Sequence, residues 1–328
     1  MKFPFDFSLS LVFRLLFPGM VLAAVMWPVI AVLLSFARVS VDAKLGLPIA
    51  AVMFGWFVVL ADQPIYILYE GRSWWPAKYR KRAIEKLSKQ LSASSDLADK
   101  LYAEGDPRNI EYYIRELDFP LDKDGRPYAA SPTRLGNIVE AFETYSNSVY
   151  GIDAIFYWPR LWIMLDKDLR NTLDESQAVA DGALYVSFSL LLGLPIVFAY
   201  AVGGWLSFHP GWRLFDLPDL PGPFWTSLTF IVMLLLSRAT YELCLWQQRV
   251  YGDLFRSLFD QFQDKLAFVD NAASIAVALG TNRQLALDNK FGVAALLLRW
   301  HRIHPSGESD TMTPEAWAEK KNGSSLLS

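Results

Sequence analysis

The fold is decided by an uncharged stretch near the start of the chain, LLFPGMVLAAVMWPVIAVLLSFA at residues 15–37. A helix rises about 1.5 Å per residue, so about twenty apolar residues span a hydrocarbon core of about 30 Å. The stretch is too long for the apolar region of a signal peptide, and transmembrane helices tolerate its prolines as kinks. Comparable stretches follow at 45–61, at 184–206 and between Asp219 and Arg238. The sequence therefore predicts four transmembrane helices.

The composition agrees with a membrane protein. Hydrophobic residues make up 53% of the 328 residues, charged residues only 20%, and the mean hydropathy is +0.20. The net charge of −3 argues against the basic face of a nucleic-acid-binding protein. The single cysteine, Cys244, rules out an internal disulfide and a cysteine-rich zinc site. We expect no nucleic-acid partner, no metal and no cofactor.

Lys and Arg near the helix ends predict the orientation, because cytoplasmic loops carry an excess of both. One side of the membrane holds three such residues, Arg38, Lys44 and Arg213. The other side holds nine: Lys2, Arg72, Lys78, Arg80, Lys81, Arg82, Arg170, Arg249 and Arg256. We therefore expect both termini and the long insertion between the second and third helices to be cytoplasmic.

We expect an all-α fold in which the parts outside the membrane are helical as well. After Val250 the apolar residues recur at helical spacing, so the fourth helix should continue beyond the bilayer. Within the insertion, an amphipathic helix at 77–91 should precede a polar SASSD linker at 92–96, and 118–132 should be a loop. The expected parts are a first hairpin (1–70), an insertion (71–183), a second hairpin (184–246), a helical extension (247–305) and a disordered tail (306–328).

Two sets of residues near the membrane are candidate functional groups. One set joins interfacial tryptophans to a basic cluster, and it either anchors the chain or binds anionic lipid head groups: Trp74, Trp75, Lys78, Arg80, Lys81 and Arg82. The other set consists of ionisable residues close to apolar runs, which are candidates for an ion pathway: Asp62, Arg238 and Glu242. Arg238 and Glu242 lie four residues apart and could instead form a structural ion pair.

The insertion contains a dense polar and aromatic stretch. Its candidate residues are Arg134, Asn137, Glu140, Asp153, Trp158 and Arg160. Glu140 and Glu143 share a helix face, as an acid/base pair or a divalent-ion site would require, although a solvated face is the commoner arrangement. Asp153 and Arg160 flank an aromatic run and could pair where the insertion meets the membrane surface, with Pro159 setting a turn.

Three short motifs in this stretch carry a resemblance: R-x-G-N from Arg134, Y-G-x-D ending at Asp153, and W-P-R-L from Trp158. They resemble a pattern of uncharacterised bacterial integral membrane proteins with an insertion between two transmembrane hairpins. The resemblance covers about residues 130–245. It implies a bacterial inner-membrane location and brings no activity with it.

The leading functional expectation is a non-catalytic, membrane-anchored interaction or scaffold protein that self-associates, alone or in a membrane complex. The apolar stripe after Val250 motivates it, because the stripe must be covered by the insertion or by another subunit. The alternatives are a subunit of an oligomeric channel or transporter and a membrane-embedded enzyme acting on a lipid-linked substrate.

Overall fold

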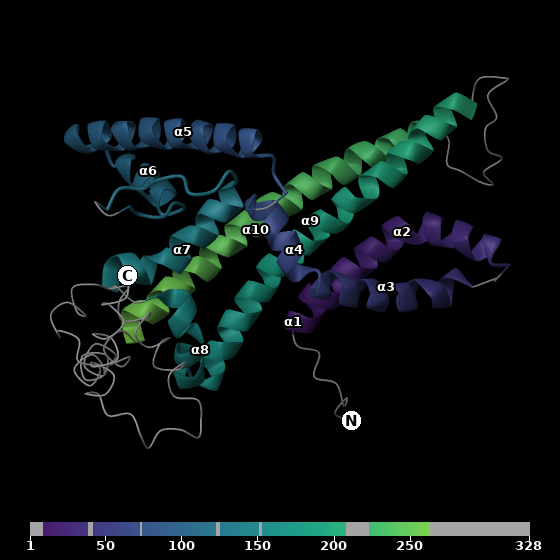
Figure 1. Ribbon diagram of the computed structural model, residues 1–328, viewed down its shortest axis with the longest axis horizontal. Coiled ribbons are helices and arrows are strands. Elements are labelled where there is room, and N and C mark those ends of the chain that lie inside the picture. The colour runs from purple at the N-terminus through teal and green to yellow at the C-terminus, as the bar shows by residue number, and fades with distance from the viewer. Residues whose placement is uncertain are drawn as a thin grey trace, which may run out of the picture.

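The computed structural model describes residues 9–38, 42–72, 74–122, 125–150, 153–207 and 223–262 (Figure 1). Within these ranges the chain is helical and contains no strand, which confirms the all-α prediction. The helices are α1 (Leu9–Leu11), the π-helical turn η1 (Val12–Leu16), α2 (Phe17–Phe36), α3 (Ala43–Leu60), α4 (Asp62–Glu70), α5 (Ala77–Ala103), α6 (Asn109–Glu116), α7 (Arg134–Tyr150), α8 (Ala154–Met164), α9 (Lys167–Ser207) and α10 (Pro223–Phe262).

Four helices are long and apolar enough to cross a membrane, as predicted. They form two hairpins, α2 with α3 and α9 with α10, and the C-terminal ends of α2 and α9 point to the same side of the molecule in Figure 1. Because each hairpin crosses the membrane twice, the chain returns to the side on which it started. The insertion, the start of α1 and the end of α10 therefore all lie on one side of the membrane. We call this the insertion side.

Small residues allow the helices of the first hairpin to approach closely. A Cβ atom added to Gly19 of α2 would lie 2.1 Å from the carbonyl oxygen of Ala51, and one added to Gly55 of α3 would lie 2.4 Å from that of Leu15. Such backbone contact is a common way of holding transmembrane helices together, because lipid provides no hydrophobic force between them. Pro18 lies in the first turn of α2, directly after the π-helical turn η1.

The two helices of the second hairpin extend far beyond the membrane. α9 has 41 residues and α10 has 40, so each is about 60 Å long, roughly twice the hydrocarbon thickness. The continuation of the fourth helix is confirmed as far as Phe262. α9 continues in the same way and includes residues 167–183, which the sequence predicts to be part of the insertion. Most of the expected extension (247–305) and the whole tail (306–328) lie outside the described residues.

The insertion covers the apolar stripe of α10. The ring of Phe255 lies 4.7 Å from that of Trp158 in α8 and 5.3 Å from that of Phe142 in α7, measured between centroids. Phe259, one turn further along, is fully buried in the same core. The stripe that required a cover is therefore covered largely by its own chain.

Two details of the insertion differ from the sequence analysis. The SASSD segment is not a linker but lies inside α5, where Ser95 hydrogen-bonds to Glu116 of α6. Pro159 does not set a turn but lies inside α8, in its second turn. In α5 the contact of Ser95 with α6 outweighs the low local helix propensity of the serines. The loop expected at 118–132 is present, with a turn in which Arg126 N donates to Asp122 Oδ1 at 2.8 Å.

Candidate binding site

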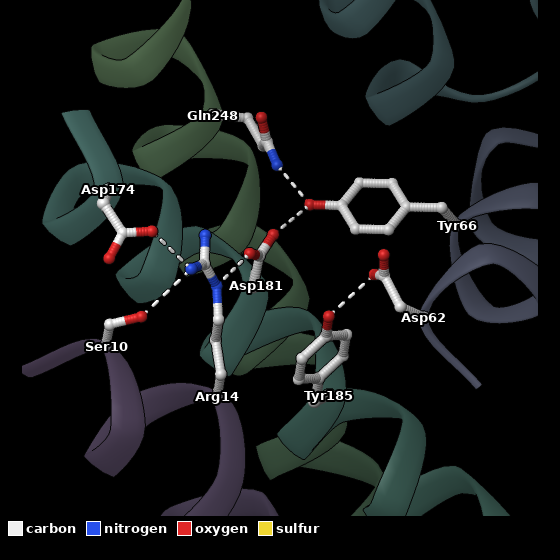
Figure 2. Close-up of polar contacts among 8 residues, drawn as sticks. All are labelled: Ser10, Arg14, Asp62, Tyr66, Asp174, Asp181, Tyr185 and Gln248. Carbon is white, nitrogen blue, oxygen red and sulfur yellow. Dashed lines mark hydrogen bonds and ion pairs between the residues drawn. The ribbon is translucent and has the colours of Figure 1, made fainter. Parts of the chain in front are cut away.

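A polar network joins the start of the first membrane helix to α9 (Figure 2). Arg14 donates from Nε to Asp181 Oδ2 at 2.7 Å, and from Nη1 to Asp174 Oδ1 at 2.6 Å and to Ser10 Oγ at 3.0 Å. Asp174 and Asp181 are two helical turns apart on α9, so both face Arg14. Asp181 is only 4% exposed, and its charge therefore depends on this partner.

α4 and α10 complete the network, as Figure 2 shows. Tyr66 donates its hydroxyl to Asp181 Oδ1 at 2.5 Å and accepts from Gln248 Nε2 at 2.7 Å. Burial raises the pKa of Tyr66 well above its ordinary value, so the hydroxyl keeps its proton and remains a donor. Beside it, Tyr185 donates to Asp62 Oδ1 at 2.7 Å. The network therefore fixes α4 against both long helices.

A cavity of about 540 Å³ lies beside this network and shares three of its residues. Its volume is within the range of small-ligand sites, and its wall combines carboxylates, amides and aromatic rings. The wall comes from α4, α7, α8, α9, α10 and the residues after α4: Asp62, Gln63, Tyr66, Ile67, Glu70, Arg72, Val139, Phe142, Glu143, Ile155, Trp158, Gln177, Gln248, Tyr251 and Phe255. Segments far apart in sequence thus meet around one space.

The carboxylates at one end of the cavity gather around Arg72. Its Nε lies 2.5 Å from Glu70 Oε2, and its Nη2 lies 3.6 Å from Glu143 and 3.7 Å from Glu140. Burial raises the pKa of Glu70 to about 7 against the opposing effect of Arg72, and the charges of Glu143 and Glu140 raise it further. Burial also raises the pKa of Glu143. The raised pKa of Glu70 therefore lies close to neutral pH.

The structure separates the three residues proposed for an ion pathway. Asp62 lies in the cavity wall, whereas Arg238 and Glu242 lie on the surface of α10, outside the cavity. Arg238 and Glu242 form the i,i+4 ion pair, and Arg134 also donates to both oxygens of Glu242, at 3.0 and 3.2 Å. Only Asp62 is therefore placed to contact a ligand in the cavity.

The R-x-G-N motif has a structural role at the start of α7. Asn137 is fully buried, accepts from the amides of Ala130 and Ser131, and donates to the carbonyls of Ser131 and Thr133 at 2.8 and 2.6 Å. All four hydrogen-bonding positions of its amide are thereby used. A Cβ on Gly136 would lie 2.7 Å from the carbonyl oxygen of Glu70. Through these contacts the motif fixes the conformation of the loop before α7 and packs the start of α7 against the end of α4.

The other motif residues lie around α8. Trp158 lines the cavity and packs on α10, as described above. The guanidinium of Arg160 lies 5.9 Å from the centroid of the Tyr157 ring, and the carbonyl of Asp153 accepts from the amide of Tyr157 at 3.0 Å. Trp158 is therefore the member of this group that reaches the candidate site.

The basic segment lies where α5 begins. Trp74 is 71% exposed with a positive φ of 66°, and the indole of Trp75 donates to the carbonyl of Leu68 at 3.0 Å. The cations that follow are all exposed: Lys78, Arg80, Lys81 and Arg82. Arg80 also donates to the carbonyl of Arg72 at 3.3 Å, which ties the start of α5 to the end of α4.

Sequence reasoning missed most of the network, including Arg14, Tyr66, Asp181 and Gln248. One signal was available, because Asp62 and Tyr66 are one helical turn apart and share a face.

Among the described residues, no group of three or more His, Cys, Asp or Glu is placed to hold a metal ion. Comparison of the chain with protein-family models, with curated proteins and with solved structures finds no match.

Proposed function

We propose that the protein is a membrane-anchored, non-catalytic binding protein whose cavity takes the cationic group of a solute or partner. The wall holds three carboxylates, those of Asp62, Glu70 and Glu143, against one guanidinium, that of Arg72. Aromatic rings in the same wall, among them Trp158, provide faces that attract cations. Above the raised pKa of Glu70, about 7, this excess of negative charge within an aromatic wall is the observation that carries the proposal.

The distribution of charge supports a surface site rather than a pore. The segments 17–36, 45–60, 182–207 and 223–237 contain no Asp, Glu, Lys or Arg. Ion pathways through a membrane are lined by charged side chains, backbone carbonyls or water-filled cavities. Apart from Arg38, Asp42 and Lys44 in and beside the turn between α2 and α3, the Asp, Glu, Lys and Arg residues of the described chain gather instead at the insertion side, where the cavity lies. We therefore place the channel alternative below a binding function.

The long helices explain how an anchor would serve such a site. α9 and α10 contribute to the membrane hairpin and to the cavity wall without interruption. The cavity is thus held at a fixed distance from the bilayer by two continuous rods. A ligand bound there stays close to the membrane surface.

Self-association does not form part of this proposal. Self-association was expected because the apolar stripe of α10 needed a cover, and the insertion of the same chain covers most of that stripe. Leu243, Trp246 and Val250 remain exposed on α10, at 46%, 56% and 38%. The mass of the protein in a mild detergent tests the point directly, because a stable oligomer at low concentration would restore a scaffold function.

We propose a cytoplasmic orientation for the insertion and a bacterial inner membrane as the location. The first rests on the excess of Lys and Arg on the insertion side, and the second on the resemblance carried by the motifs around Arg134 and Trp158. The exposed cations at the start of α5, from Lys78 to Arg82, are on the side that this orientation requires.

Spermidine is a suitable probe for the cavity. The thermal unfolding of the purified protein is followed at pH 8 with spermidine and with sodium chloride of equal ionic strength. We expect stabilisation by spermidine that is lost in Glu143→Gln and kept in the control Glu104→Gln, since Glu104 is exposed at the end of α5. The same stabilisation in wild type and Glu143→Gln would refute the proposed site.

A further inference from the structure

A second hollow, of about 450 Å³, lies between α4, α9 and α10 and reaches into the membrane. Its wall is mostly apolar and includes Leu191 of α9 and Leu234 of α10, which belong to the membrane-spanning parts of these helices. At its other end lie Trp75, just before α5, and Arg238. The groove therefore runs from hydrocarbon depth to the level at which charged residues begin.

The polar groups on the floor of this groove are already satisfied. Ser187 Oγ donates to the carbonyl of Ser237 at 3.0 Å, and the hydroxyl of Ser237 donates back to the carbonyl of Ser187 at 3.2 Å. The hydroxyl of Tyr69 lies 3.0 Å from Ser187 Oγ. Because these groups bond to one another, the floor can accept an alkyl chain without leaving buried polar groups unpaired.

The rim of the groove carries a net positive charge. Arg238 is more than half exposed, and its ion-pair partner Glu242 is shared with Arg134. Two guanidinium groups thus face one carboxylate, which leaves one positive charge in excess. The basic segment from Lys78 to Arg82 starts three residues after Trp75 and adds to this field.

We propose that this groove binds one anionic phospholipid of the leaflet on the insertion side. An acyl chain lies along Leu191 and Leu234, and Arg238 pairs with the phosphate. Trp75 is fixed at the edge of the groove by its bond to Leu68, at the level of the head groups. This site is separate from the acidic cavity and does not depend on the function proposed for that cavity.

Native mass spectrometry of the full chain in a mild detergent tests the proposal. The probes are phosphatidylglycerol and phosphatidylcholine with identical acyl chains, added at equal concentrations. We expect one phosphatidylglycerol to be retained in preference to phosphatidylcholine. Arg238→Gln should reduce that preference about fivefold, as expected for one basic residue at the surface, and Arg238→Lys should keep most of it.

A groove-filling variant separates the groove from general attraction to anionic lipid. Leu234→Trp should abolish retention of the single lipid, whereas Leu192→Trp, on the neighbouring position of α9 outside the groove, should not. Arg38→Gln, in the turn on the opposite side of the membrane, is the control for loss of charge. Equal retention of both lipids, or unchanged retention in Arg238→Gln or Leu234→Trp, would overturn the proposal.

Discussion

Replacing Glu70 with Gln should stabilise the protein at high pH and leave it unchanged at low pH. The side chain is buried, and its pKa is raised from an ordinary 4.5 to about 7. Below pH 4.5 the carboxyl is protonated in both the folded and the unfolded chain. Between pH 4.5 and 7 only the folded chain keeps the proton, so the free energy of unfolding falls as the pH rises.

The size of the effect follows from the same displacement of the pKa. A rise from 4.5 to about 7 corresponds to about 3 kcal/mol of lost stability at pH 8. The amide of Gln resembles the protonated carboxyl and carries no charge, so Glu70→Gln should recover most of this loss. For a chain of this size, we expect a rise in the midpoint of thermal unfolding of roughly 6 °C.

The measurement is thermal unfolding in detergent, followed by circular dichroism at pH 5 and pH 8. Glu140→Gln is a matched control, because Glu140 is near the same Arg72 but its side chain is 32% exposed. An exposed ion pair contributes less than about 1 kcal/mol, so this variant should change little at either pH. If Glu70→Gln lowers the midpoint at pH 8, the pair with Arg72 outweighs burial and our reasoning about this end of the cavity is wrong.

Three further predictions concern the fold. Arg14→Met leaves the buried carboxylate of Asp181 without its partner and should lower the free energy of unfolding by about 3–5 kcal/mol. This loss should be seen as a lower yield and a lower unfolding midpoint. Asp174→Asn, at the exposed end of the network, should have little effect. Gly55→Ala should destabilise the first hairpin because of the 2.4 Å contact, whereas Gly203→Ala, with open space around the added Cβ, should be neutral or slightly stabilising in the same assay. Tyr102→Cys, exposed on α5, should react with a membrane-impermeant maleimide only after cells are permeabilised, and labelling of intact cells would reverse the proposed orientation.

The sequence was sufficient for the membrane half of the fold. Uninterrupted apolar runs, such as residues 15–37, are long enough to span the bilayer whatever their neighbours are. The continuation of α10 was also predictable, because the apolar spacing after Val250 is periodic. The continuation of α9 beyond the bilayer was harder to predict, because residues 167–183 are mostly polar and their apolar face is short. Its continuity results from packing against α10.

The candidate site could not be predicted in the same way, because its residues come from distant parts of the chain. Tyr66 and Gln248 are 182 residues apart, and no local pattern links them. Asp62 was recognised because a carboxylate at the end of an apolar run is unusual. Arg14 directly precedes the first uncharged stretch, so the sequence alone suggests no more than the boundary of a span. The structure places it inside a continuous helical segment, with its guanidinium turned toward α9.

The network around Asp181 is a more costly way to join helices than apolar packing would be. Replacing a buried ion pair with well-packed apolar side chains is often neutral or stabilising, so anchorage alone does not require Arg14 and Asp181. The network does accomplish one thing that apolar packing does not. It orients the hydroxyl of Tyr66 and holds α4 so that Asp62 and Glu70 lie in the cavity wall. This arrangement is what a protein that binds a cationic group at the cavity, as we propose, would use to position its carboxylates.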